Sequence, residues 1–562
     1  MNSQDNRNLI IALALSVAVF WGWSYFYEKP QQKQQAAQSA VESKSASQAP
    51  AVAVEPVLAN RDVAVTQGPR LSIDSPTVKG SINLQGGRLD DIVLKDYLQT
   101  TEPNSGHVAV LSPEKSKDGY YTEFGWVSSD KGLTLPDAST PWTAQGNKEL
   151  KPDAPVTLTY ETKDLSFTRE LTMDKDYLIT VKDQVTSKMD KAVRLNPYAL
   201  VLRESVPKTQ DFFILHEGPI GYLADKLVEI KYTDFEKKPV QTFASKGGWL
   251  GITDKYWLVA LIPDQTMDVS VNYREIKKVK GSKIQVDFTG PEMSLEPAKT
   301  ISFTQHVFAG PKVLHLLDGY ETKLGVKHFD LAVDFGWFYF LTKPIFYLLT
   351  SAKDFLGNLG LGILLLTVVL KVLFFPLANK SFRSMARMKA LQPKIEALRE
   401  RFKDDKLRVN QEIMELYKRE KVNPMAGCLP TVVQIPVFFA LYKVLFVTIE
   451  MRHAPFYGWI HDLSAPDPTN LFTLFGLIPW SPPSMFMIGG WPLIMGATMI
   501  LQQRLSPTPA DPTQEKMMLM MPVFFTYLLA SFPAGLVIYW AWNNILTMLQ
   551  QLTIMRMESK RK

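Results

Sequence analysis

The run at residues 359–376 (LGLGILLLTVVLKVLFFP) is apolar and nearly long enough to cross a membrane, which limits the folds open to this chain. It contains a single charged residue, Lys371. As a helix, residues 359–375 would rise about 26 Å, somewhat less than the roughly 30 Å hydrocarbon core of a bilayer. A lysine inside such a span costs roughly 2.5 to 3.5 kcal/mol on insertion, so it requires water, a partner or a function. The simpler alternative is that Lys371, about 6 Å from the helix end, extends its long side chain to the lipid headgroups.

A second apolar run, at residues 9–26, precedes a segment of low complexity. The run is long for a signal peptide, ends in aromatic residues and is not followed directly by a small-x-small cleavage site. We therefore predict an uncleaved transmembrane anchor at residues 1–28, with a cleaved signal peptide as the alternative. Residues 31–55 are rich in Gln, Ala and Ser and cannot bury a core, so they predict a flexible tether at residues 29–58.

Residues 59–333 have the pattern of a large β domain. Apolar and polar residues alternate in short runs, with Gly, Pro, Asn and Asp between them, and this predicts an antiparallel β-sandwich. The one cysteine, Cys428, excludes an intramolecular disulfide, so the core alone must stabilise this domain. Its histidines and carboxylates are scattered, and we expect no metal, no cofactor and no catalytic residue. The clearest runs are 156–161, 165–171, 177–181, 284–288 and 301–307.

Residues 334–357 form an aromatic segment that charges interrupt. Lys343, Pro344, Lys353 and Asp354 break the run, which makes it a poor transmembrane span. We predict an amphipathic helix lying in the membrane interface, with a re-entrant segment as the alternative.

A charged region at residues 377–429 follows the second span, which we place at 358–376. Two apolar stripes with helical spacing flank a charged turn at residues 403–406, which indicates a hairpin of two antiparallel helices with a shared apolar seam. Pro393 should start or kink a helix. Residues 377–423 contain thirteen basic and seven acidic side chains. The excess of six positive charges equals the net charge of the whole chain, +6. The stripes are Met388, Leu391, Ile395, Leu398 and Phe402, then Val409, Ile413 and Leu416.

This charge asymmetry orients the chain. By the positive-inside rule, the hairpin and the basic C-terminal tail are cytoplasmic. Residues 430–562 would hold four further spans and the tail, which gives six crossings, both termini inside and the β domain outside. A short run at 471–480 would lie on the outer surface. The four spans are predicted at 431–449, 486–505, 517–532 and 534–551.

Polar side chains within the predicted spans suggest a wet cavity. Thr367 and Lys371 are four residues apart and share one helix face. If Gln434, Asn543 and Asn544 face Lys371, their amides would lower the cost of burying its charge. Because no acidic residue lies within the spans, such a cavity would attract a negative guest, for example a carboxylate on another protein. The alternative is that these amides only join helices.

Apolar and aromatic side chains complete the predicted lining. Ile435 and Phe438 belong to one span, and Tyr539 and Trp540 belong to another. A methionine-rich surface at residues 517–525 could accept apolar partners of varied shape, with ordinary contact to lipid as the alternative. Lys443, near the other end of its span, is expected to extend toward the headgroups.

Five blocks of this sequence resemble the YidC/Oxa/Alb family of membrane protein insertases, and the similarity covers essentially the whole chain. The resemblance implies a five-helix core with a hydrophilic groove open to lipid and cytoplasm, and a β-supersandwich as the outer domain. It also implies that Lys371 is the groove's cation, where the family usually has an arginine; lysine keeps the charge but loses the bidentate fork. The blocks are TVVLKVLFFPL (367–377), MKALQPKIEALRERFKDDK (388–406), KVNPMAGCLPTVVQIPVFFALY (421–442), HDLSAPDP (461–468) and FPAGLVIYWAWNN (532–544).

The resemblance implies a non-enzymatic insertase and chaperone of the bacterial inner membrane. Its partners would be nascent membrane proteins, the lipid bilayer, the Sec translocon, and the ribosome and signal recognition particle at the cytoplasmic loops, but not DNA. Burial of apolar segments in lipid would drive insertion without ATP. Two other classes remain as alternatives. A polar-solute (anion) transporter would use the same buried cation, although no inverted repeat is evident, and an anchored carbohydrate-active enzyme would need a carboxylate or histidine pair in the outer domain.

Overall fold

The computed structural model describes residues 60–209, 215–278, 281–336, 338–402, 405–420, 422, 429–476, 478, 487–506 and 512–559. The predicted anchor at 1–28 and the predicted tether at 29–58 lie outside these residues, as do Cys428 and the last three residues of the basic tail.

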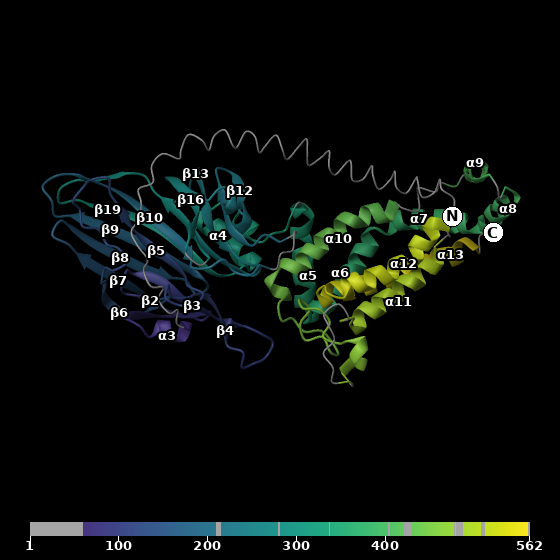
Figure 1. Ribbon diagram of the computed structural model, residues 1–562, viewed down its shortest axis with the longest axis horizontal. Helices are drawn as coiled ribbons and strands as arrows, with labels where there is room; N and C mark the ends of the chain where they lie inside the picture. The colour runs from purple at the N-terminus through teal and green to yellow at the C-terminus, as the bar shows by residue number, and fades with distance from the viewer. Residues whose placement is uncertain are drawn as a thin grey trace. The chain divides into compact units, whose positions relative to one another are not determined.

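Nineteen strands occur in the described residues, all of them in the first part of the chain (Figure 1). They are β1 (Arg70–Asp74), β2 (Val78–Asn83), β3 (Arg88–Leu98), β4 (His107–Leu111), β5 (Tyr120–Val127), β6 (Thr143–Lys151), β7 (Ala154–Glu161), β8 (Leu165–Met173), β9 (Leu178–Ser187), β10 (Val193–Arg203), β11 (Gly218–Leu223), β12 (Lys226–Glu229), β13 (Val240–Lys246), β14 (Trp249–Thr253), β15 (Trp257–Ile262), β16 (Asp268–Lys277), β17 (Ser282–Thr289), β18 (Met293–Leu295) and β19 (Thr300–Pro311).

The strands form two hydrogen-bonded series with antiparallel pairing. One series runs β1, β2, β3, β5, β10, β17, β16, β13, with β4 beside β3 and β18 beside β10. The other runs β6, β7, β8, β9, β19, β15, β14, β11, β12. A short parallel pairing of β1 with β6 joins the two series. The predicted antiparallel β domain is confirmed, and the five runs that predicted it coincide with β7, β8, β9, β17 and β19.

The core of this domain lies between the two series. Strand β8 buries every second residue, as a strand does when one of its faces packs inward. The rings of Phe288 on β17 and Phe303 on β19 lie 6.2 Å apart, and both side chains are buried. The Tyr273 hydroxyl on β16 donates to the Ile220 carbonyl oxygen on β11 at 3.2 Å. These contacts each join one series to the other.

An ion pair is buried within this core. Arg169 on β8 donates to Asp183 on β9 through Nε (2.6 Å to Oδ1) and Nη2 (3.1 Å to Oδ2). The same guanidinium donates to the carbonyl oxygens of Gly87 (3.2 Å) and Phe124 on β5 (2.9 Å). Because Arg169 is only 1% exposed, these bonds replace its lost hydration.

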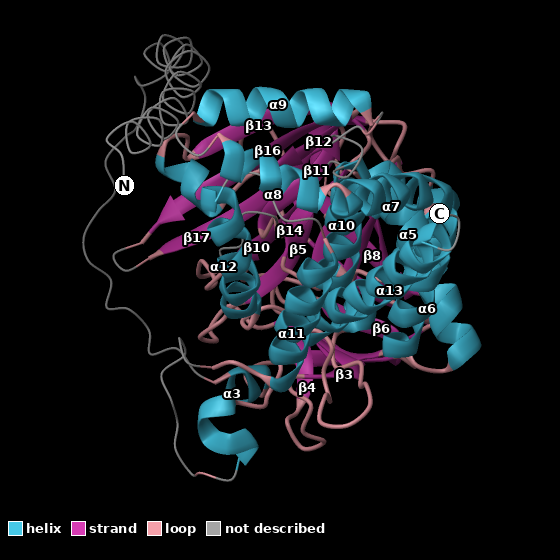
Figure 2. Cartoon of the chain, turned by 90° about the vertical axis from the view of Figure 1, so that its right-hand side faces the viewer, coloured by secondary structure: helices cyan, strands magenta, loops and turns pink. Residues whose placement is uncertain are grey.

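Helices dominate the chain after β19. Helix α13 lies against α6, α10 and α11 (Figure 2). The four spans predicted within 430–562 fall on α10 to α13. The helices and helical turns are α3 (Arg61–Val65), η2 (Tyr232–Glu236), α4 (Leu314–Leu324), η3 (Phe329–Ala332), α5 (Tyr339–Leu356), α6 (Leu359–Leu373), α7 (Phe375–Ala390), α8 (Gln392–Arg401), α9 (Lys406–Arg419), α10 (Leu429–Val447), η5 (Ile449–Met451), η6 (Leu471–Gly476), α11 (Gly490–Leu505), α12 (Pro512–Leu529) and α13 (Ala534–Ser559).

The apolar run at 359–376 is helical from Leu359 to Leu373, two residues short of the predicted end at 375. Helix α6 ends at Leu373 and α7 begins at Phe375, with a bend of 70° between them. Pro376 lies in the first turn of α7, where the missing N–H is tolerated. In the described part of the chain no single helix is both long and apolar enough to cross a membrane, whereas α6 and α7 together pass that test as a bent pair.

The charged region contains α7, α8 and α9. Pro393 lies in the first turn of α8, where the sequence indicated that a helix could start. Phe402, which was predicted to belong to the apolar seam, is not part of it: its ring lies 5.0 Å from the guanidinium carbon of Arg408. The buried seam consists of Met388, Leu391, Ile395, Ile413, Leu416 and Val422, with Leu398 and Val409 packed against it.

Candidate functional site

A cavity of about 490 Å³ lies among α6, α7, α10, α11, α12 and α13. Helix α6 contributes Lys371 to its wall from its last turn. None of the described residues that line the cavity is acidic. The cavity therefore contains a cation without an acidic partner in its wall.

The ammonium of Lys371 is held at one point by α13. Its Nζ donates to Thr547 Oγ1 at 2.7 Å, and the Thr547 hydroxyl donates to the carbonyl oxygen of Asn543 at 2.6 Å. Because that hydroxyl has already donated its proton within its own helix, it presents a lone pair to Lys371. This contact fixes Lys371 against α13 and argues against a lysine that only extends to the headgroups.

The other polar groups of the wall have defined partners. Gln434 Nε2 on α10 donates to the Tyr539 hydroxyl on α13 at 3.1 Å. The buried Thr367 hydroxyl donates to the Ile363 carbonyl oxygen one turn earlier at 2.7 Å. Helices α10 and α13 are thus joined by one hydrogen bond across the wall.

Aromatic rings form the apolar side of the cavity. The ring of Trp540 lies 4.8 Å from that of Phe438 and 5.8 Å from that of Phe525 on α12. Ile435 lines the cavity and is also exposed at the surface of α10. The cavity thus has a polar wall and an aromatic wall.

Eight of the nine residues predicted from the sequence line this cavity, namely Thr367, Lys371, Gln434, Ile435, Phe438, Tyr539, Trp540 and Asn543. The ninth, Asn544, is buried on a different face of α13 and donates from Nδ2 to Thr498 Oγ1 on α11 at 3.1 Å. Asn544 therefore joins α13 to α11 and does not face Lys371, in line with the alternative in which these amides only hold helices together.

The sequence did not identify the residues that extend the polar wall along α13. Thr547 and Gln551 follow Asn543 at intervals of four residues, and Gln550 lies beside them, so continuing the helical spacing from Asn543 would have found them. Gln551 Nε2 donates to the carbonyl oxygen of Leu505 at the end of α11.

Large apolar side chains are exposed next to the cavity. On α12 they include Met517, Met520 and Phe524, and on α6 they include Val372 and Leu373. Exposed apolar surface of this extent is typical of a surface that meets lipid or an apolar partner.

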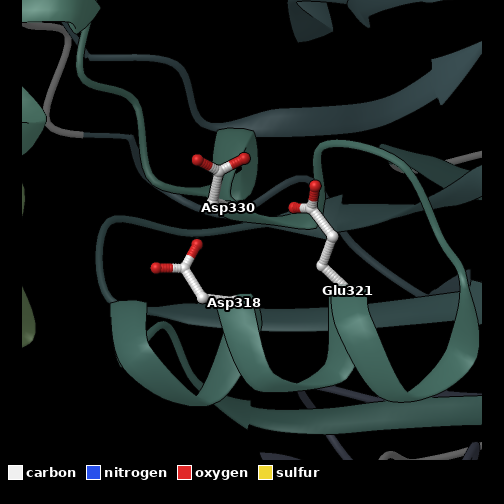
Figure 3. Close-up of side chains that lie close together, drawn as sticks. All are labelled: Asp318, Glu321 and Asp330. Carbon is white, nitrogen blue, oxygen red and sulfur yellow. The ribbon is translucent and has the colours of Figure 1, made fainter.

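Three carboxylates in the segment between β19 and α5 lie within 4.8 Å of one another, on Asp318, Glu321 and Asp330 (Figure 3). The ammonium of Lys343 on α5 lies 2.9 Å from Asp318 and 2.6 Å from Asp330. Although burial opposes it, hydrogen bonds to these carboxylates raise the pKa of Lys343 above its usual range. Lysine already supplies the positive charge that a metal ion would bring, so the cluster is an ion-pair network.

The class of protein is set by two features: a large antiparallel β domain, and a helical part whose cavity holds a lysine without an acidic partner among the described wall residues. Two family models match adjacent parts of the chain, the YidC periplasmic domain at residues 70–348 and the 60Kd inner membrane protein at residues 351–561. The chain belongs to the YidC family of membrane protein insertases, a family of the bacterial inner membrane.

Curated relatives match over nearly their full length. The membrane protein insertase YidC of Rickettsia bellii is 47% identical over 98% of this chain and 99% of the relative. The membrane protein insertase YidC of Brucella suis is 46% identical over 98% of this chain and 96% of the relative. A crystal structure of an active YidC insertase with its first transmembrane domain resolved is 17% identical, covers 87% of this chain and 95% of that chain, and has a TM-score of 0.34. The transporter alternative has no support in these matches.

Proposed function

We propose that this chain inserts nascent inner-membrane proteins into the bilayer, with the cavity around Lys371 as the path of the polar part of the substrate. One observation favours this most: the cavity holds a cation, its described wall contains no acidic residue, and exposed apolar helix surfaces adjoin it. A site with these properties receives a carboxylate on one side and an apolar segment on the other.

The polar end of a substrate enters the cavity and meets Lys371, whose ammonium has donors beyond the one that Thr547 accepts. The apolar segment of the substrate moves along α10 and α12, which correspond to the third and fifth predicted spans. Transfer of that segment into lipid contributes on the order of several kcal/mol and drives the step. The protein lowers the barrier for the polar end and performs no covalent chemistry.

The proposed topology has six crossings, both termini in the cytoplasm and the β domain in the periplasm. Helices α8 and α9 form a cytoplasmic hairpin, where the ribosome and the signal recognition particle meet the chain, and α5 lies in the interface. Exposed apolar side chains on α5, such as Phe340 and Phe355, fit that position. The insertase works alone or with the Sec translocon.

Reconstituted proteoliposomes test this proposal with a single-span substrate whose translocated segment is either acidic or neutral. We expect Lys371→Ala to slow insertion of the acidic substrate, because its carboxylate loses the cation, while Lys371→Arg retains activity. Lys380→Ala, at an exposed position on α7, is the matched control. Equal insertion of both substrates by all variants would contradict the role of Lys371.

A further inference from the structure

The C-terminal end of α10 contacts the segment that connects the β domain to α5. Lys443 on α10 forms an ion pair with Asp334 in that segment, with Nζ and Oδ1 2.8 Å apart. The two side chains are only 13% and 15% exposed. Lys443, which was expected to extend to the headgroups, therefore pairs with a carboxylate in the protein.

Asp334 joins three separate parts of the chain. Its Oδ2 accepts a hydrogen bond from the backbone N–H of His216 in the β domain at 3.0 Å. Its Oδ1 accepts one from the backbone N–H of Gly336 at 3.1 Å, in addition to the ammonium of Lys443. Because these donors fix both oxygens, the carboxylate has one defined orientation.

Gly336 leaves the space that Lys443 needs. Its φ is +67°, and a Cβ at this position would lie 2.9 Å from Lys443 Cε. A side chain here would both strain the backbone and displace the lysine. The turn and the ion pair are therefore fitted to each other.

Two more contacts hold the same end of α10 to the β domain. Arg452, just after η5, donates from Nη2 to the carbonyl oxygens of Leu98 (2.6 Å) and Gln99 (3.0 Å). In addition, Lys255 Nζ lies 3.9 Å from the ring centroid of Phe446 on α10. The ion pair thus belongs to a group of contacts concentrated on this end of the helix.

The same helix lines the cavity between one and three turns earlier. Phe438 lies five residues before Lys443, about 7.5 Å along the helix axis. We propose that Asp334 and Lys443 are positioning residues for insertion: by fixing α10 against the connecting segment, they hold the cavity wall of α10 in place. The β domain and its connection to α5 then act on the cavity through α10.

A double-mutant cycle on the full chain in proteoliposomes tests this inference, which rests on the proposed function for its activity readout. The variants are Asp334→Asn, which keeps the size of the side chain, Lys443→Met, and both together. Lys327→Met is the matched control, because it removes an exposed ion pair with Asp225 at the same 2.8 Å separation. A second readout needs no substrate: the distance between spin labels at exposed positions 439 on α10 and 549 on α13.

We expect each single variant to lower insertion roughly fivefold and to broaden the label distance, while the double variant is no worse than either single one. Lys327→Met should leave both readouts unchanged. Wild-type insertion and an unchanged label distance in the three variants would overturn the inference, as would additive losses with an unchanged distance. If the wild-type chain failed to insert substrates, the proposed function would fail instead, and the label distance would still decide the role of the pair.

Discussion

Lys371 on α6 and Thr547 on α13 form a hydrogen bond of 2.7 Å between two helices that are far apart in the sequence. Thr547 accepts this bond because its own proton is donated to Asn543 in its helix. The bond orients the ammonium and still leaves it with further donors for water or a guest.

Thr547→Val should impair insertion of substrates with acidic translocated segments by about three- to tenfold, because an ammonium that loses a hydrogen bond is no longer fixed at the wall. Thr547→Ser should retain activity, since it keeps the acceptor. Insertion rates in proteoliposomes measure the effect, and Thr553→Val is the matched control, because Thr553 bonds only within α13 on an exposed face. Equal losses for Thr547→Val and Thr553→Val would show that the contact with Lys371 has no special role.

Asn543 and Asn544 are neighbours with different contacts, so substituting one should affect insertion and substituting the other should affect stability. Asn544→Leu removes the bond to Thr498 and should lower the free energy of unfolding by about 1 kcal/mol, with normal insertion by the folded protein. Asn543→Leu should reduce insertion and change stability little, since Asn543 lines the cavity. Thermal unfolding and insertion assays on the same preparations test this, and identical behaviour of the two variants would refute the assignment.

The buried pair of Arg169 and Asp183 should be a major source of stability in the β domain once one partner is removed. Arg169→Met leaves a carboxylate with its charge uncompensated, and we expect a loss of about 3 to 5 kcal/mol in unfolding free energy. Arg194→Met is the control, because its pair with Asp130 is exposed. Denaturant unfolding of both variants measures the difference, and a similar small loss in each would contradict the prediction.

Glu450 in η5 should make stability depend on pH. Burial raises the pKa of its carboxyl from 4.5 to about 7, and its Oε1 has no hydrogen-bond partner among the described residues. The folded protein therefore keeps a proton that the unfolded chain has lost, so its stability falls as the pH rises from about 4.5 through 7. Glu450→Gln should remove this dependence and be more stable above pH 7, by on the order of 2 kcal/mol. Measurements of unfolding free energy between pH 4 and 8 test this, and the same pH dependence in the wild type and in Glu450→Gln would contradict it.

The β domain could be predicted because its signal is local. Alternation along β8 and β9 reflects a face that is buried over the whole strand. The pairing of Arg169 with Asp183 could not be predicted, since it depends on the register between these two strands, which places Arg169 opposite Asp183.

The cavity could be predicted because polar residues are rare in apolar helices, so Lys371, Gln434 and Asn543 stood out. Asn544 was not expected to lie elsewhere, because its position depends on where α11 packs: its side chain points about 100° away from that of Asn543 and donates to Thr498 on α11. The end of α6 was placed two residues late because the apolar run continues to Pro376, which is compatible with the end of one helix and with the first turn of the next. The 70° bend between α6 and α7 was not predicted.

Site-specific photocrosslinking to a stalled nascent membrane protein in native membranes would show whether a substrate passes through the cavity around Lys371. The crosslinker would replace Gln434, Ile435 or Trp540, which line the cavity, with Leu549 as an exposed control on α13 outside it. We expect crosslinks from the three cavity positions and none from position 549. Crosslinks absent from all three, in a chain that still folds and inserts its substrate, would show that the substrate takes another path and that Lys371 has a structural role.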